Sequence, residues 1–124
     1  MNVIINGTEY PIAYTVEAQS KLAERAGGLD KIKDMIGSQE LSHMAVLHIM
    51  MEAAERREKV MAKMAGEEYS GPVIPDEEDL NDLILIGEMP EVMKRITLAM
   101  REGNKSEVEI KEETGKKRSA TRSK

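Results

Sequence analysis

Histidines are the first residues here that could hold a metal ion, and the sequence contains only His43 and His48. They are five residues apart, which separates them by about 140° around a helix. A helical zinc pair needs ligands four residues apart, so that both point to the same side. His48 and Glu52 have that spacing, but two ligands do not make a zinc site. We therefore expect polar positions on a mostly buried helix, and no metal ligands are predicted.

Clustered carboxylates are the other candidates for chemistry, at Glu67–Glu68 and Asp76–Asp79. Consecutive side chains on a helix point in different directions, and the pattern lacks the glycine and distal glutamate of a calcium loop. Asp76 is instead a favourable N-cap, and the acids after it stabilise the positive end of a helix dipole. Gly27–Gly28 is interpreted as a helix stop rather than a phosphate-binding turn. No nucleotide-binding motif or nucleophile elbow is present, so we expect no catalytic residue, no cofactor and no enzyme.

The composition narrows the class of protein further. The chain has 124 residues, no cysteine, tryptophan or phenylalanine, and a formal net charge of −5. Without cysteine there are no disulfides, thiol nucleophiles or thiolate metal sites, which is typical of a reducing cytoplasm. No apolar run approaches the roughly 18–20 residues of a membrane span, so no membrane partner is expected. The acidic balance disfavours a general nucleic-acid binder.

Ten methionines are the unusual feature of this composition. Methionine is flexible and polarizable, so it fills irregular gaps in cores and also suits adaptable binding surfaces. Two interpretations stay open. The methionines could fill an adaptable helical core, or they could form a flexible apolar surface that binds another chain. Met44, Met50 and Met51 are expected to be buried. The candidates for partner binding are Met61, Met64, Met89, Met93 and Met100.

The elements that position these side chains begin with a β-hairpin. Residues 1–5 are rich in β-formers, and Asn6–Gly7 tolerates the positive φ angles of a two-residue type I′ turn. The second strand should follow over residues 8–14. Pro11 cannot donate to a ladder, so this strand should be an edge strand or end there.

Helical periodicity replaces the strand pattern from Thr15 onward. Thr15, Ser38 and Asp76 are the expected N-caps. A Pro/Gly-containing loop over residues 66–75 separates the longest helix from the last two. The expected helices span residues 16–26, 29–36, 39–65, 77–86 and 90–102.

The longest expected helix, 39–65, changes character along its length. Its first half is apolar around the whole circumference, which indicates burial on all sides. Its second half is amphipathic, and Glu52 with Arg56 and Glu55 with Lys59 are favourable i,i+4 pairs. We therefore expect a central helix whose first half is surrounded and whose second half projects.

Charge divides the chain into two parts. Residues 1–103 carry 11 basic and 19 acidic side chains and should form one hairpin-plus-helices domain, whereas residues 104–124 carry 7 basic and 4 acidic ones. The second part is expected to be a disordered polar tail, in which residues 106–111 could alternate as a short strand. The basic tip, 116–124, is either a solvated terminus or a segment that contacts nucleic acid or an acidic partner.

This order of parts resembles the small tail assembly chaperones of long-tailed bacteriophages and prophages, the lambda gpG-like group. The resemblance covers about residues 1–103 and rests mainly on Ile4–Pro11 and Gly27–Asp30. The order of elements read from the residues predicts a mainly α fold, with an N-terminal β-hairpin followed by about five helices in a small bundle.

The resemblance implies a function. Proteins of this family bind the long, helical tape measure protein, help to recruit the tail tube protein and are absent from the mature virion. They act in the cytoplasm of the bacterial host, and many also occur as a longer product of ribosomal frameshifting. The residues alone support a helical protein-interaction module. A homo-oligomeric, prophage-encoded regulatory or structural adaptor is the first alternative, and a nucleic-acid-associated protein is the second.

Overall fold

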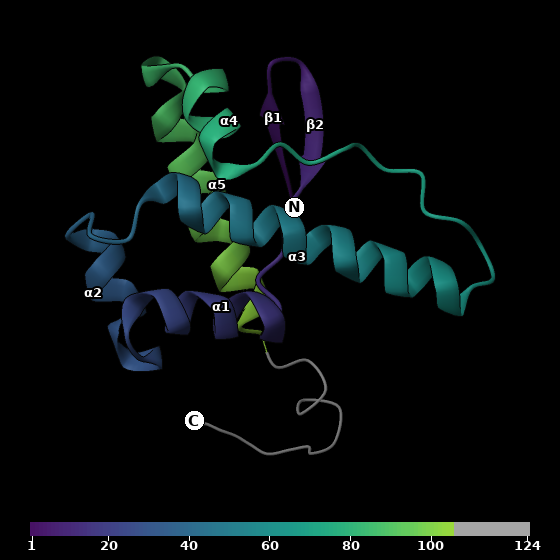
Figure 1. Cartoon of the computed structure of the whole chain (residues 1–124), viewed down its shortest axis with the longest axis horizontal. Coiled ribbons are helices and arrows are strands. Elements are labelled where there is room, and N and C mark those ends of the chain that lie inside the picture. The colour runs from purple at the N-terminus through teal and green to yellow at the C-terminus, as the bar shows by residue number, and fades with distance from the viewer. Residues whose placement is uncertain (106–124) are drawn as a thin grey trace.

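The computed structural model describes residues 1–105, in which an N-terminal hairpin precedes five α-helices (Figure 1). Strand β1 (Asn2–Ile5) pairs antiparallel with β2 (Thr8–Pro11). Asn6 and Gly7 have φ angles of 51° and 79°, which confirms the predicted type I′ turn. Pro11 is the last residue of β2, as predicted. The hairpin therefore forms at the expected register.

Helix α1 (Val16–Ala26) has the predicted bounds. The Thr15 hydroxyl accepts a hydrogen bond from the Ala18 amide at 3.1 Å, and Gly27 ends the helix in the left-handed conformation. The next expected helix, 29–36, is instead divided. A 3₁₀ turn, η1 (Leu29–Lys31), precedes α2 (Ile32–Gly37), and Lys31 joins the two with φ −101° and ψ −5°.

The long central helix, α3 (His43–Met64), begins four residues later than predicted. Gln39 adopts a φ of 65°, which interrupts the helical path, and Ser42 rather than Ser38 is the N-cap. The Ser42 hydroxyl accepts from the Ala45 amide at 3.1 Å. The intervening turn buries Leu41 in the core, which explains why the chain does not continue as helix from residue 39.

The two last helices also differ from their predicted bounds. Helix α4 (Glu77–Leu83) has the predicted Asp76 cap but ends before Ile86, and a 3₁₀ turn, η2 (Ile86–Glu88), follows. The Leu85 amide donates to the Glu88 carboxylate at 2.8 Å, so this short turn replaces the last part of the expected helix. Helix α5 (Met89–Gly103) then has proline in its first turn, as predicted.

The core surrounds the first half of α3 (Figure 1). This helix contacts α1, α4, α5 and β2, while its second half extends away from the other helices. The predicted burial along all sides of its first half is therefore confirmed. The buried residues of α3 are Met44, Ala45, Val46, Leu47, Ile49, Met50, Met51, Ala53 and Ala54.

No helix formed by residues 1–105 is both long and apolar enough to cross a bilayer. The expected short strand at 106–111 and the expected basic tip at 116–124 lie outside the described residues. The division of the chain at residue 104 stays a prediction for the same reason.

Candidate protein-interaction surface

The projecting half of α3, residues 56–64, is called the arm here (Figure 1). Three apolar side chains on it are exposed to solvent, Val60 by 54%, Met61 by 50% and Met64 by 83%. These three residues are called the arm stripe. Two of the predicted partner-binding methionines therefore lie together on one exposed helical segment, although their role in binding stays a prediction.

The 66–75 loop returns beside the arm and shapes a hollow of about 540 Å³ against it. Tyr69 is the main contact, because the Lys59 ammonium lies 5.5 Å from its ring centroid, within the range of a cation–π interaction. Burial raises the pKa of the Tyr69 phenol, and the nearby Glu55 and Glu58 carboxylates raise it further. The loop thus covers the side of the arm that bears these acids.

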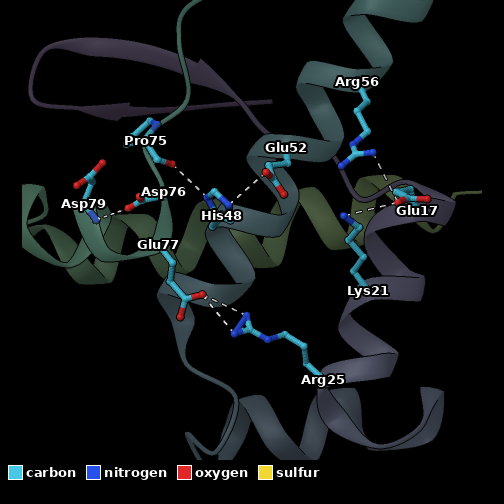
Figure 2. A network of polar contacts seen from close by, with 10 residues as sticks. All are labelled: Glu17, Lys21, Arg25, His48, Glu52, Arg56, Pro75, Asp76, Glu77 and Asp79. Carbon is cyan, nitrogen blue, oxygen red and sulfur yellow. Dashed lines mark hydrogen bonds and ion pairs between the residues drawn. The ribbon is translucent and has the colours of Figure 1, made fainter.

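One ion pair joins the base of the arm to α1 (Figure 2). The Glu17 carboxylate lies 3.9 Å from Arg56 and 3.8 Å from Lys21. The predicted pairing of Arg56 with Glu52 is wrong, because the Arg56 guanidinium turns toward α1 instead. The predicted pair of Glu55 and Lys59 is present at 3.8 Å. These contacts leave the arm stripe uncovered.

His48 connects α3 to the end of the 66–75 loop (Figure 2). Its Nδ1 lies 3.1 Å from the Pro75 carbonyl oxygen, which can only accept, so Nδ1 carries the proton. Its Nε2 lies 3.4 Å from the Glu52 carboxylate. Within residues 1–105, no three His, Asp or Glu side chains are placed to hold a metal ion. The contacts of His48 are structural, since they hold the loop immediately before α4.

We expect His48→Ala to loosen the 66–75 loop while leaving the core folded. The variant loses the hydrogen bond to Pro75, a contribution of about 1 kcal/mol to the free energy of unfolding. Limited proteolysis within the loop should be faster, and urea unfolding should measure the lower stability. The control is Glu52→Gln, which keeps the bond to Pro75. Equal cleavage rates for the two variants would contradict this role.

A second exposed apolar region lies between α2 and α5. Met93 and Met100 line it together with Ile36, in a groove of about 280 Å³. Met93 is 40% exposed, whereas Met100 is half-buried against the core. A neighbouring hollow of about 620 Å³ shares Ile36 and Met100 and adds Leu29, which is exposed. The groove extends along α5.

The structure therefore separates the five predicted methionines into three environments. Met61 and Met64 lie on the arm, and Met93 and Met100 line the α2–α5 groove. Met89 is half-buried against the core at the start of α5, so it joins neither surface. The five do not form one continuous site.

Sequence reasoning also missed exposed apolar residues outside the arm, among them Leu85 and Ile86, which are 68% and 87% exposed. The pattern placed Ile86 on the apolar side of a helix that ends before it. No lysine or arginine occurs in residues 76–91, and Arg25 from α1 donates twice to Glu77 at 3.2 and 3.3 Å (Figure 2). The acidic residues of this segment are Asp76, Glu77, Glu78, Asp79, Asp82, Glu88 and Glu91.

Comparison with known proteins finds no matching family model, no matching curated protein and no matching solved structure. The function must therefore be argued from the geometry of the chain itself. That geometry offers an exposed apolar stripe on a projecting helix and a methionine-lined groove. Both features are suited to contacts with another polypeptide.

Proposed function

We propose that this chain is a non-enzymatic chaperone of phage tail assembly, which binds the tape measure protein and recruits the tail tube protein. The arm stripe is the observation that supports this proposal. It presents Val60, Met61 and Met64 on a helix that extends beyond the core. An amphipathic helical client can lie along such a stripe and cover its own apolar face.

The size of the stripe suits a client that must later be released. Full burial of one valine or methionine side chain contributes about 1.5–3 kcal/mol. Association costs at least about 4 kcal/mol in lost freedom of motion, so three such residues give only weak binding at a single position. A long helical client with several apolar segments can bind several copies of the chain, and the combined affinity is then much higher.

The α2–α5 groove supplies a second surface of the same kind. Met93 and Met100 can change rotamer to fit different apolar side chains at little cost. A chaperone with two separate adaptable surfaces can hold a client on one while it meets a tube subunit on the other. The net charge of −5 helps to keep a protein with exposed apolar residues soluble.

The test is co-expression of the tagged full chain with the genes that follow it in its own genome. We expect capture of a very long helical protein or a tail tube subunit, and no chain in mature particles. Met61→Lys combined with Met64→Lys should reduce capture at least tenfold. Ile4→Lys is the matched control, because Ile4 is 65% exposed on β1, opposite Glu9.

The opposite outcome favours the alternative function. Recovery of only copies of the chain, together with long proteins that stay soluble without it, would contradict the chaperone proposal. The chain would then be a homo-oligomeric adaptor encoded by a prophage. Equal loss of capture in Met61→Lys, Met64→Lys and in the Ile4→Lys control would show that the arm stripe is not the binding surface.

A further inference from the structure

Basic side chains border one edge of the arm stripe, and one lies within it. Successive residues of a helix are separated by about 100°, so the three residues of the arm stripe lie within an arc of about 100°. Arg57 lies inside that arc, and Lys63 lies about 60° beyond its edge at Val60. Glu58 lies about 60° beyond the other edge, at Met61, where both residues line the hollow against the loop, and Glu55 lies on the opposite side of the helix. The basic residues of the arm are Arg56, Arg57, Lys59 and Lys63.

Two of these four cations are engaged within the molecule. Arg56 pairs with Glu17, and Lys59 pairs with Glu55 beneath the Tyr69 ring. Arg57 and Lys63 are exposed, and neither forms an ion pair with any residue among those the structure describes. Arg57 within the arm stripe and Lys63 beyond its Val60 edge are therefore two positive charges that no acid among residues 1–105 neutralises in an ion pair.

We propose that the arm binds an acidic amphipathic helix, whose apolar face covers the arm stripe and whose carboxylates pair with Arg57 and Lys63. The inference rests on the proposed function and names the chemistry of its client segment. Arg57 and Lys63 are separated by about 9 Å along the helix axis. A client helix packed alongside therefore needs acidic residues about one heptad apart at the edge of its apolar face, as in coiled coils.

Ion pairs at the edge of the arm stripe select the partner helix. Most of the affinity comes from the apolar contacts. Opposite charges accelerate encounter and disfavour helices with basic borders, because like charges facing each other are repelled. The pairs at the edge of the stripe stay accessible to solvent, so added salt should weaken the selection. The apolar contacts should persist at high salt.

The test uses two designed peptides and the full chain. Both peptides are 21-residue amphipathic helices with leucine at the a and d positions of three heptads, flanked by glutamate in one and by lysine in the other. Fluorescence anisotropy gives the Kd of each. We expect the glutamate peptide to bind at least tenfold more tightly at low salt, and we expect this ratio to shrink as salt is added.

Charge reversal supplies the matched control. Arg57→Glu combined with Lys63→Glu should abolish or invert the preference between the peptides, while circular dichroism shows an unchanged fold. Lys31→Glu combined with Lys94→Glu makes the same change in net charge at exposed positions that line neither the arm nor the α2–α5 groove, and it should leave the preference intact. Equal affinity for the two peptides, or equal effects of the two double variants, would overturn the proposal.

Other occupants of the arm give different results, and each would also overturn it. Salt-sensitive self-association that Arg57→Glu, Lys63→Glu abolishes would identify the acidic 76–91 segment of a second copy as the occupant. Binding of neither peptide until residues 106–124 are removed, and then of both peptides with equal affinity, would identify the chain's own C-terminal segment as the occupant.

This inference and the proposed function can fail separately. Undiminished capture of the tape measure protein by the Arg57→Glu, Lys63→Glu variant would refute the acidic-helix proposal and leave the chaperone function standing. A clear preference for the glutamate peptide, together with no capture of any tail protein, would refute the function and leave the binding chemistry standing.

Discussion

Met50→Lys is expected to abolish cooperative folding. Met50 is completely buried in the first half of α3, where its side chain is surrounded by the core. A lysine there must bury an ammonium group or push the core apart, at a cost above about 4 kcal/mol. A domain of this size has only about 5–15 kcal/mol of stability, so the variant should be largely unfolded. Thermal unfolding followed by circular dichroism at 222 nm measures the loss.

The position of Met50 adds a second reason for this large effect. Its backbone carbonyl accepts a hydrogen bond from the Ala13 amide at 3.2 Å, where the chain leaves the hairpin. Distortion of α3 at this residue therefore also loosens the connection between the hairpin and α1. The effect should extend beyond one helix.

The control for this prediction is Met61→Lys on the arm. Met61 is half-exposed, so the ammonium group can reach water, and the free energy of unfolding should change by no more than about 0.5 kcal/mol. Met50→Leu, a change of shape without charge, should cost less than about 1.5 kcal/mol. If Met50→Lys and Met61→Lys were equally stable, the division between core and surface methionines would be wrong.

Elements specified by local chemistry were predictable from the sequence. Asn6 and Gly7 tolerate the φ angles of the hairpin turn, and Thr15 and Gly27 define both ends of α1 through caps that involve only neighbouring residues. The burial of the first half of α3 was predictable as well, because a helix that is apolar on every side must be surrounded.

Boundaries that depend on tertiary contacts were not predictable. Ser38 and Ser42 are both acceptable N-caps, and the burial of Leu41 between them decides in favour of the second. The end of α4 depends on the Glu88 side chain, which accepts from the Leu85 amide and starts a new turn. Neither choice follows from periodicity alone.

The candidate surface was predictable only in part. The loss of apolar character along α3 indicated that Met61 and Met64 lie outside the core, and both are exposed. The same reasoning could not separate Met89 from Met93, because their exposure depends on how α5 is rotated against its neighbours. The two cations of the arm that form no ion pair within residues 1–105, Arg57 and Lys63, were also missed, because the sequence gave no reason to single them out.

Gly103→Ala should destabilise the protein by about 1–3 kcal/mol, although alanine is the better helix former. The predicted last helix ended at residue 102, whereas Gly103 is the last residue of α5 and Asn104 is the cap. A Cβ at this position would collide with the backbone carbonyl oxygen and the Cβ of Tyr14. Tyr14 lies between the Ala13 amide, which is bonded to α3, and the Thr15 cap of α1, so its backbone cannot retreat without breaking one of them.

A second glycine in an equivalent helical position separates this clash from helix propensity. Gly37 is the last residue of α2, and an added Cβ would meet no atom within 4 Å. Gly37→Ala should therefore be neutral or stabilise the protein by up to about 1 kcal/mol. In urea unfolding, the midpoint should fall for Gly103→Ala. The midpoint should rise or stay unchanged for Gly37→Ala. Equal stability of the two would mean that α5 can move away from Tyr14, and the close approach of these segments would then not hold the end of α5 against the start of α1.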